Sequence, residues 1–283
     1  MNSRCYLCGS ENLLKRCGTV RDNADIDILQ CSNCGLVFLS SFEHIHTTFY
    51  EDSGMHARDI DTNAWLRQSA ADDERRYKQL RRTIENKRLL DFGCGAGGFL
   101  MHARHTASSC CGVEVESRLA GHFSKNSLEV YNNLCNVPGR YDIITLFHVL
   151  EHFPDPGNLL KQLGDKLSQD GQIIIEVPNS EDALLTLYEC DAFTDFTYWS
   201  CHLFLFNAAT IKKLADQSGF KTNHVQHIQR YSLANHLHWL SKGKPGGHIK
   251  WAFLDNERLD EAYAASLSSA GISDTIFCSL SKH

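Results

Sequence analysis

The sequence feature that most limits the possible folds is a glycine-rich loop between a predicted strand and a predicted helix. Residues 87–92 end in the apolar run Leu-Leu-Asp-Phe, residues 93–98 contain four glycines, and residues 99–103 have helical character. Glycines let the backbone approach a ligand closely, and the N-terminus of a helix favours negative charge. A strand, a glycine loop and a helix in this order are typical of nucleotide-binding α/β folds.

An acidic residue follows the loop at the distance that such folds require. The predicted strand 109–114 ends in Glu114. In α/β cofactor-binding folds, an acid about 20 residues after the loop accepts hydrogen bonds from the ribose hydroxyls. Glu114 is therefore predicted to bind a ribose, with Glu116 as a neighbouring alternative.

Strands and helices continue to alternate toward the C-terminus. The predicted strands are 141–147, 171–177, 225–228 and 275–280, and the predicted helices are 64–86, 157–168 and 208–218. Such alternation is typical of a doubly wound α/β sheet with helices on both faces. The predicted fold class is therefore α/β.

The first 42 residues predict a separate module held by a metal. Four of the 12 cysteines form two C-x-x-C-G turns, Cys5 with Cys8 and Cys31 with Cys34, and residues 30–39 predict a strand. Two such turns direct four thiolates at one point, which suits a closed, structural Zn²⁺ site. Iron in the same geometry is the alternative. Residues 1–42 are accordingly predicted to be a zinc-binding ribbon.

Composition narrows the class of protein. The 283 residues suggest one large and one small domain, and the formal charge of −6 gives no general attraction to nucleic acid. No apolar run approaches the roughly 20 residues that span a bilayer, and the N-terminus lacks the apolar stretch of a signal peptide. A cytoplasmic protein whose partner is a small molecule, with neither a membrane span nor a nucleic-acid partner, is therefore expected. No oligomeric state is indicated.

The segments together resemble class I S-adenosylmethionine-dependent methyltransferases. The resemblance rests on residues 90–97, 112–114, 147–152, 171–179, and 202–206 with the later Gly219-Phe220, and it covers about residues 88 to 230. It implies a Rossmann-like, seven-stranded sheet. The implied organisation is a linker and helix over 43–87 and a methyltransferase core over 88–283, with an insertion at 230–273.

The resemblance also implies which residues bind S-adenosylmethionine. The implied cofactor-binding residues are Asp91, Gly93, Gly95, Gly97, Glu114, Phe147 and His148. Of these, the aspartate and the first two loop glycines line the methionine portion, and Glu114 binds the ribose. Phe147 and His148 end a strand that faces the transferable methyl group.

The cysteine-rich start resembles the zinc module of some sugar methyltransferases, so a sugar, nucleotide-sugar or glycan is the expected acceptor. In the sugar C-methyltransferases, a Tyr and a Glu accompany a histidine in the segment after the fifth strand. Residues 199–202 read Trp-Ser-Cys-His here. His202 matches, whereas Cys201 occupies the Glu position, which favours methylation of oxygen over carbon. His202 is the expected general base, because histidine titrates near neutral pH, and His148 is the second candidate.

The segment 230–273 is longer than the turn that the basic fold needs between its last two strands. It is predicted to be a helical insertion that covers an anionic acceptor, and its basic, aromatic and amide residues are the candidate contacts. These residues are Arg230, Tyr231, Asn235, His236 and His248. The alternative is a helical hairpin that only covers the sheet.

Other functions remain open. His148-Val149-Leu150-Glu151-His152 fits the H-x-x-E-H motif of inverted zinc peptidases, which needs an unbroken helix; Pro154 and Pro156 disfavour that helix. A sugar C-methyltransferase, a cofactor-binding regulatory or scaffold protein, and an RNA or protein methyltransferase are the further alternatives.

Overall fold

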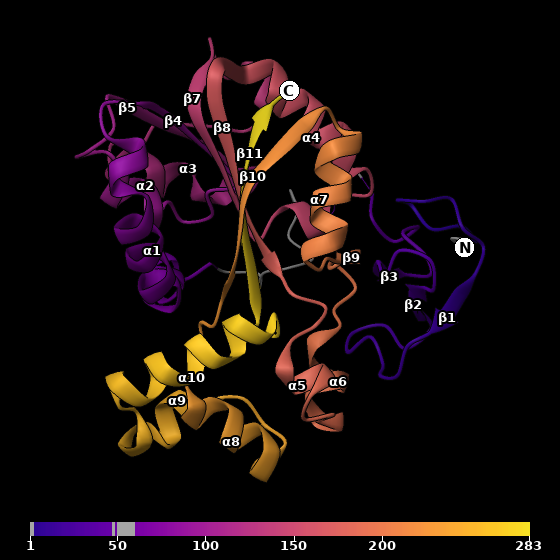
Figure 1. Ribbon diagram of the computed structural model, residues 1–283. Helices are drawn as coiled ribbons and strands as arrows, with labels where there is room; N and C mark the ends of the chain where they lie inside the picture. The colour runs from indigo at the N-terminus through magenta and orange to yellow at the C-terminus, as the bar shows by residue number, and fades with distance from the viewer. Residues whose placement is uncertain (1–2, 47–48, 50–59) are drawn as a thin grey trace.

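A seven-stranded mixed sheet forms the centre of the molecule (Figure 1). The computed structural model describes residues 3–46, 49 and 60–283. The strand order is β10-β11-β8-β7-β4-β5-β6, and β11 runs antiparallel to both of its neighbours. The strands are β4 Arg88–Phe92, β5 Ser109–Val113, β6 Val130–Tyr131, β7 Tyr141–Phe147, β8 Leu167–Pro178, β10 Phe220–Ile228 and β11 Thr275–Lys282. The predicted doubly wound, seven-stranded fold is confirmed.

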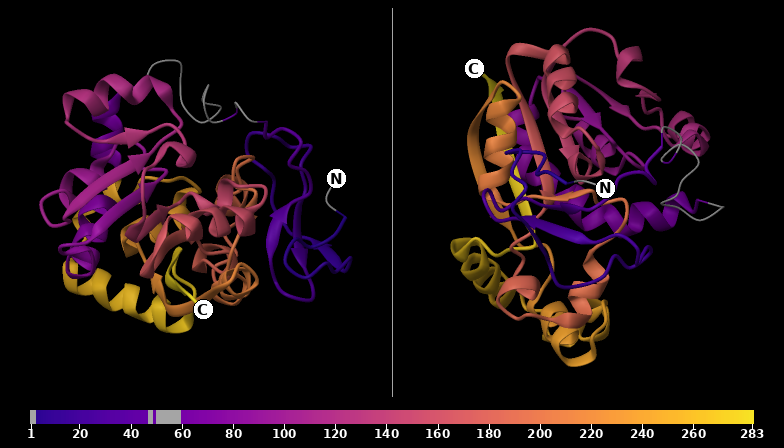
Figure 2. Two further views of the ribbon diagram at one scale, coloured as in Figure 1. Left: turned by 90° about the horizontal axis from the view of Figure 1, so that it is seen from above. Right: turned by 90° about the vertical axis from the view of Figure 1, so that its right-hand side faces the viewer.

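Helices cover both faces of this sheet (Figures 1 and 2). The helices outside the insertion are α1 Thr62–Ile84, α2 Gly98–Ala103, α3 Ala120–Lys125, α4 Pro156–Lys166, α5 Ala183–Thr186, α6 Asp191–Thr197 and α7 Ala208–Gln217. On one face, Leu80 and Ile84 of α1 pack with Phe99 of α2 in one apolar cluster. On the other face, Leu160 of α4 and Leu214 of α7 belong to a second, larger cluster. Burial of these apolar side chains drives the layered arrangement.

The N-terminal segment forms its own small sheet and shares it with the core. The strands β1 Leu13–Lys15, β2 Ile28–Cys31 and β3 Val37–Leu39 are joined by β9 Phe204–Leu205 from the core. The single strand predicted for residues 30–39 is wrong. The second cysteine turn reverses the chain there, so β2 and β3 pair antiparallel, with Ile28 opposite Leu39.

The small sheet is anchored to the core by side chains as well as by β9. The Tyr6 hydroxyl accepts a hydrogen bond from the Gly157 backbone N–H at 3.0 Å and contacts the Asp155 carboxylate. Gln217 Nε2 donates to the Leu7 carbonyl oxygen at 2.9 Å. One apolar cluster runs from the N-terminal segment into α4 and α7. The N-terminal segment is therefore packed against the larger core and is not joined to it by a linker alone.

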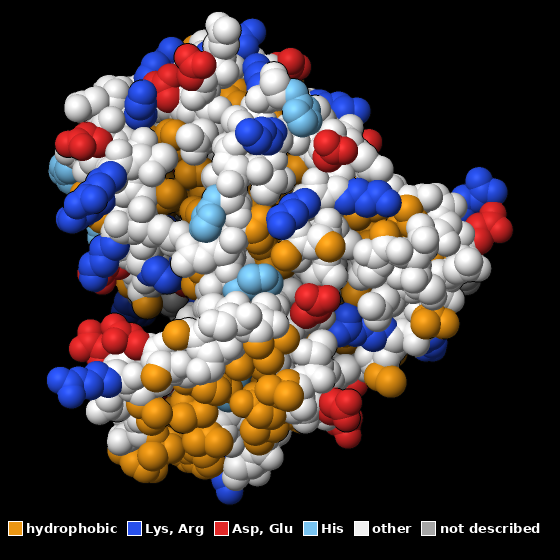
Figure 3. Space-filling model, viewed as in Figure 1, with side chains coloured by type: hydrophobic (Ala, Val, Ile, Leu, Met, Phe, Trp, Pro, Cys, Tyr) orange, Lys and Arg blue, Asp and Glu red, His pale blue; other side chains and the backbone are white. Residues whose placement is uncertain are grey.

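The insertion between β10 and β11 is helical, as predicted. It contains α8 Leu233–Lys242, α9 Gly247–Lys250 and α10 Glu257–Ala270. Apolar side chains gather on the surface of this region in Figure 3, and the most exposed are Ile249 and Phe253. Among the described residues, none of the helices is both long enough and apolar enough to cross a membrane.

Candidate functional site

A cavity of about 410 Å³ opens at the carboxyl ends of β4, β5 and β7. Open α/β sheets bind their ligands at this edge. The lining comes from α1, the glycine loop and the residues just after the three strands. It includes Trp65, Asp73, Arg76, Asp91, Gly93, Gly95, Glu114, Phe147, His148, His152 and Phe153. The structure thus brings together most of the predicted cofactor-binding residues.

The glycine loop has a backbone that other residues rarely adopt. Gly93, Gly95 and Gly97 have φ values of +74°, +53° and +78°, in the region that favours glycine. The Gly93 N–H donates to the Val113 carbonyl oxygen at 2.8 Å, which fixes the loop to the end of β5. A Cβ atom on Gly95 would lie 2.9 Å from the ring of Trp65. The glycines therefore allow a tight loop against which neighbouring side chains pack closely, and Gly93 and Gly95 line the cavity.

Glu114 is held by the loop that it faces. Its Oε2 accepts the Gly95 backbone N–H at 2.8 Å, and its Oε1 accepts the Glu116 N–H at 3.0 Å. Burial raises the pKa of Glu114. Both carboxylate oxygens of the alternative, Glu116, are bonded to the Arg118 guanidinium at 2.7 and 2.6 Å. Glu116 is thus paired with a cation, whereas the carboxylate of Glu114 accepts only backbone N–H groups.

Asp91 is buried at the end of β4. Thr145 Oγ1 donates to its Oδ1 at 2.7 Å, and burial raises the pKa of Asp91 to about 7. A carboxylate that is costly to ionise is stabilised by a nearby cation. Asp91 is thus suited to face a positively charged group of a ligand in the cavity.

His148 lies directly after β7 with an unusual backbone. Its φ is +56°, which is uncommon for a residue other than glycine and often marks a functional position. Its ring lies between two buried carboxylates: Nδ1 is 3.5 Å from Oε1 of Glu151 and Nε2 is 3.3 Å from Oε1 of Glu176. The ring is therefore held at the cavity wall between two acids.

A charge network behind His148 was not predicted from the sequence. Glu176 at the end of β8 accepts hydrogen bonds from Arg76 at 2.7 Å and from Arg75 at 2.9 Å. The nearby His148 ring and these two cations hold the pKa of Glu176 well below its usual range, although burial acts to raise it. The Arg76 guanidinium also lies 4.5 Å from the centre of the Phe147 ring. In the sequence, this network is indicated only by Glu176 itself, an acid within an apolar strand. A buried acid must be paired.

The predicted base His202 lies behind the cavity wall. Among the described residues that line the cavity, the histidines are His148 and His152. The ring centre of His202 is 5.0 Å from that of His152, and burial lowers the pKa of His202 to about 3. His152 lines the cavity although the sequence does not single it out as a site residue.

The local backbone does not fit the peptidase alternative. The motif needs both histidines on one face of a continuous α-helix. His148 has positive φ, and the following turn, Leu150–His152, is a short 3₁₀ segment. The motif is therefore not presented on a helix, and the peptidase reading is not supported.

The insertion residues gather elsewhere. Arg230, Tyr231 and His248 line a second cavity of about 960 Å³, which shares no lining residue with the first within the described chain. Arg230 is already paired, with Asp72 at 3.2 Å and Asp274 at 3.3 Å. The structure does not bring these three residues to the cofactor cavity.

Two further predicted acceptor contacts lie inside the insertion. Asn235 and His236 are buried. The side-chain Oδ1 of Asn235 accepts the Gly247 N–H at 3.2 Å, and His236 Nδ1 lies 2.7 Å from the Tyr263 hydroxyl. These contacts join α8 to α9 and α10. The two side chains therefore hold the insertion together.

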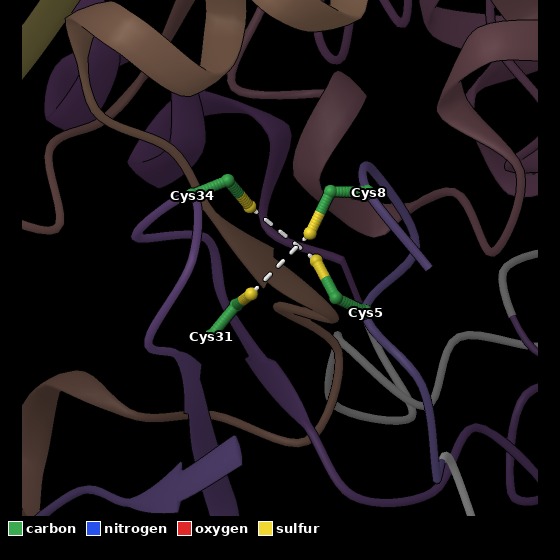
Figure 4. Close-up of side chains that lie close together, drawn as sticks. All are labelled: Cys5, Cys8, Cys31 and Cys34. Carbon is green, nitrogen blue, oxygen red and sulfur yellow. Dashed lines mark hydrogen bonds between the residues drawn. The ribbon is translucent and has the colours of Figure 1, made fainter. Parts of the chain in front are cut away.

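The four cysteines of the N-terminal turns converge (Figure 4). All four sulfurs lie within 4.8 Å of one another, and the closest pairs are 3.4 Å apart (Cys5 and Cys34) and 3.5 Å apart (Cys8 and Cys31). A disulfide would need about 2.05 Å, whereas four thiolates at tetrahedral positions suit Zn²⁺. These residues fit a structural zinc ion.

Sequence comparison connects this architecture with known proteins. A family profile described as a methyltransferase domain matches residues 64–225, more than half of the chain. A ubiquinone biosynthesis O-methyltransferase from Aeromonas salmonicida is 25% identical over 104 residues, covering 33% of this chain and 44% of that protein. Another from Pseudomonas aeruginosa is 26% identical over 110 residues, covering 34% and 46%. The chain spans less than half the length of these curated relatives.

Solved structures share the fold. A SAM-dependent methyltransferase from Thermotoga maritima has a TM-score of 0.50 at 18% identity, covering 79% of this chain and 96% of its own. One from Archaeoglobus fulgidus has a TM-score of 0.50 at 20% identity, covering 77% and 99%. With the profile match over more than half of its length, the chain belongs to the methyltransferase-domain family.

Proposed function

We propose that the protein transfers a methyl group from S-adenosylmethionine to an oxygen atom of a small hydroxylated acceptor. The observation that carries this proposal is the cavity that joins the glycine loop, Glu114 and His148 at one edge of the sheet. The family match supports methyl transfer, and the similarity to ubiquinone biosynthesis O-methyltransferases supports oxygen as the methylated atom.

The cavity walls fit the cofactor part by part. Glu114 offers a buried carboxylate to the ribose hydroxyls, and the positive-φ loop offers a close backbone surface. Asp91 offers a negative charge to the methionine end. When bound, S-adenosylmethionine supplies a methyl group on a positively charged sulfur. Alignment of the acceptor oxygen with that methyl group is worth about 7–11 kcal/mol.

His148 is the proposed general base. Its ring is at the cavity wall, and Glu151 and Glu176 flank its two nitrogens. The acceptor oxygen would form its bond to the methyl carbon while the methyl–sulfur bond breaks with its electron pair moving to sulfur. The hydroxyl proton would move to Nδ1 of the neutral His148 ring, whose Nε2 keeps its proton toward Glu176. The flanking carboxylates stabilise the resulting imidazolium. A base of this kind contributes about 10²–10⁴ in rate. His202, the first candidate from the sequence, does not line this cavity and is not the base in this proposal.

A sugar or sugar conjugate remains the proposed acceptor. The support is the four-cysteine cluster, which matches the module of the resembled sugar methyltransferases, and the cavity formed by the insertion. Tyr231 and His248 have ring centres 5.9 Å apart and line that second cavity. We propose that these two rings bind the part of a sugar conjugate that is remote from the methylated oxygen. A cytoplasmic location stays a prediction.

The test is transfer of labelled methyl groups into a fractionated cell extract. The full chain is incubated with S-adenosylmethionine labelled in the methyl group, and labelled products are identified by mass spectrometry. We expect a methyl ether on a small molecule. His148→Ala should lower the rate about 10²-fold or more, whereas His224→Ala, an exposed histidine on β10, is the matched control.

Three outcomes would contradict the proposal. Tight binding of the cofactor without label transfer into any fraction would favour a regulatory or scaffold protein. Label on a carbon atom would favour the C-methyltransferase alternative. Label retained on RNA or protein after removal of small molecules would favour the macromolecular methyltransferases.

A further inference from the structure

Three side chains outside the four-cysteine cluster also converge as metal ligands would. One ring nitrogen each of His152 and His202 and the sulfur of Cys201 lie within 4.8 Å of one another. The four-cysteine cluster meets the same limit. With Zn–S bonds of about 2.3 Å and Zn–N bonds of about 2.0–2.1 Å, ligand atoms of a tetrahedral site are about 3.5 Å apart. Small side-chain movements therefore suffice to close the site around an ion.

The backbone holds the two contributing segments against each other. The Leu203 N–H donates to the Glu151 carbonyl oxygen at 2.9 Å, and His152 Nδ1 lies 2.8 Å from the carbonyl oxygen of Cys201. Because a carbonyl oxygen only accepts, Nδ1 carries the proton and Nε2 carries the lone pair. Metal-binding histidines in proteins are oriented by this type of hydrogen bond. The cluster is thus arranged before any ion binds.

A buried acid beside the cluster lacks a hydrogen bond among the described residues. Glu151 is completely buried, and neither of its carboxylate oxygens has a hydrogen-bond partner among the described residues. The closest printed contact is His148 Nδ1 at 3.5 Å. An unsatisfied buried carboxylate is costly. A divalent ion bound to one thiolate and two neutral imidazoles has a net charge of +1, which would offset the charge of Glu151.

We propose that His152, Cys201 and His202 form a second metal site, of the class that binds Zn²⁺ with nitrogen and sulfur ligands. Three protein ligands leave the fourth tetrahedral position open, unlike the closed four-cysteine site. His152 also lines the cofactor cavity, so one ligand of the proposed site lies at the wall of that cavity. The role of this ion rests on the proposed function. The ion would make an acceptor hydroxyl at that open position more acidic, and His148 would then deprotonate it more readily.

Metal content of the purified full chain tests the site. After saturation with Zn²⁺ and removal of the excess, we expect inductively coupled plasma mass spectrometry to give two zinc ions per chain. Cys201→Ala and His202→Ala should each retain one. Cys34→Ala should also retain one, because it removes the other ion. The matched controls Cys278→Ala, a buried cysteine in β11, and His224→Ala should retain two.

Substitution with Co²⁺ keeps the test decisive if a variant is unstable. In the wild type, the second equivalent of Co²⁺ should give the absorption of a single cobalt–thiolate bond, and Cys201→Ser should abolish it. A wild-type stoichiometry of one, or two ions retained by Cys201→Ala, overturns the proposal. Methyl transfer by a protein with one ion would contradict this site alone, whereas two ions without methyl transfer would contradict only the proposed function.

Discussion

The backbone N–H of Gly95 donates to Oε2 of Glu114 at 2.8 Å, so the glycine loop itself orients the acid that faces the cofactor cavity. The carboxylate of Glu114 therefore both bonds to the loop and lines the cavity. The two motifs that the sequence shows separately, a glycine loop and an acid after the next strand, are one hydrogen-bonded unit in the folded protein.

Glu114→Ala should weaken binding of S-adenosylmethionine about 10- to 100-fold. Hydrogen bonds to charged groups are worth about 1.5–3 kcal/mol, and the change also frees the Gly95 N–H. Isothermal titration calorimetry measures the dissociation constant. Glu129→Gln, an exposed acid next to β6, is the control and should bind normally. Unchanged affinity in Glu114→Ala would move the ribose contact to Glu116.

The core could be predicted because its signals are local. The apolar runs of β4, β5 and β7 and the glycine loop each fall within a few adjacent residues. The strand predicted across 30–39 is wrong because the C-x-x-C-G turn that begins at Cys31, itself visible in the sequence, separates β2 from β3.

The walls of the cavity depend on contacts between distant residues. Arg76 meets Glu176 across 100 positions in the sequence, and His152 meets Cys201 across 49. No local pattern signals either pair. Similarly, Arg230 looked like an anion ligand because the sequence does not show that Asp72 and Asp274 already pair with it.

Asp91→Asn should stabilise the protein without cofactor, and more so at higher pH. The folded-state pKa of Asp91 is about 7, above the usual 3.8, because burial disfavours the ionised form. The resulting penalty is absent below about pH 4, grows up to pH 7 and is complete above it. Urea unfolding at pH 5 and pH 8 should therefore show a larger gain in the free energy of unfolding at pH 8. Asp165→Asn, an exposed acid on α4, is the control. A gain that falls with rising pH would refute the assignment.

Cys34→Ala should lower the stability of the whole chain, not only of the N-terminal segment. Loss of the ion removes the link between the two cysteine turns, and metal binding supplies folding free energy in small zinc modules. Since β3 pairs with β9 of the core, we expect one lower denaturation midpoint rather than two separate transitions. Circular dichroism during urea unfolding measures this. Cys17→Ala, an exposed cysteine outside the turns, should leave the midpoint unchanged. A separate early transition in Cys34→Ala would show an independent module.

Arg230→Ala should destabilise the fold by about 3 kcal/mol. The change leaves Asp274 buried without its cation and removes the partner of Asp72, and breaking a buried pair typically costs about 3–5 kcal/mol. Urea unfolding should show this loss. Arg67→Ala removes an exposed arginine from the same cavity and should change the free energy of unfolding by less than about 0.5 kcal/mol. If Arg230→Ala instead unfolds normally and raises only the KM for the acceptor, Arg230 binds the acceptor, as the sequence alone predicts.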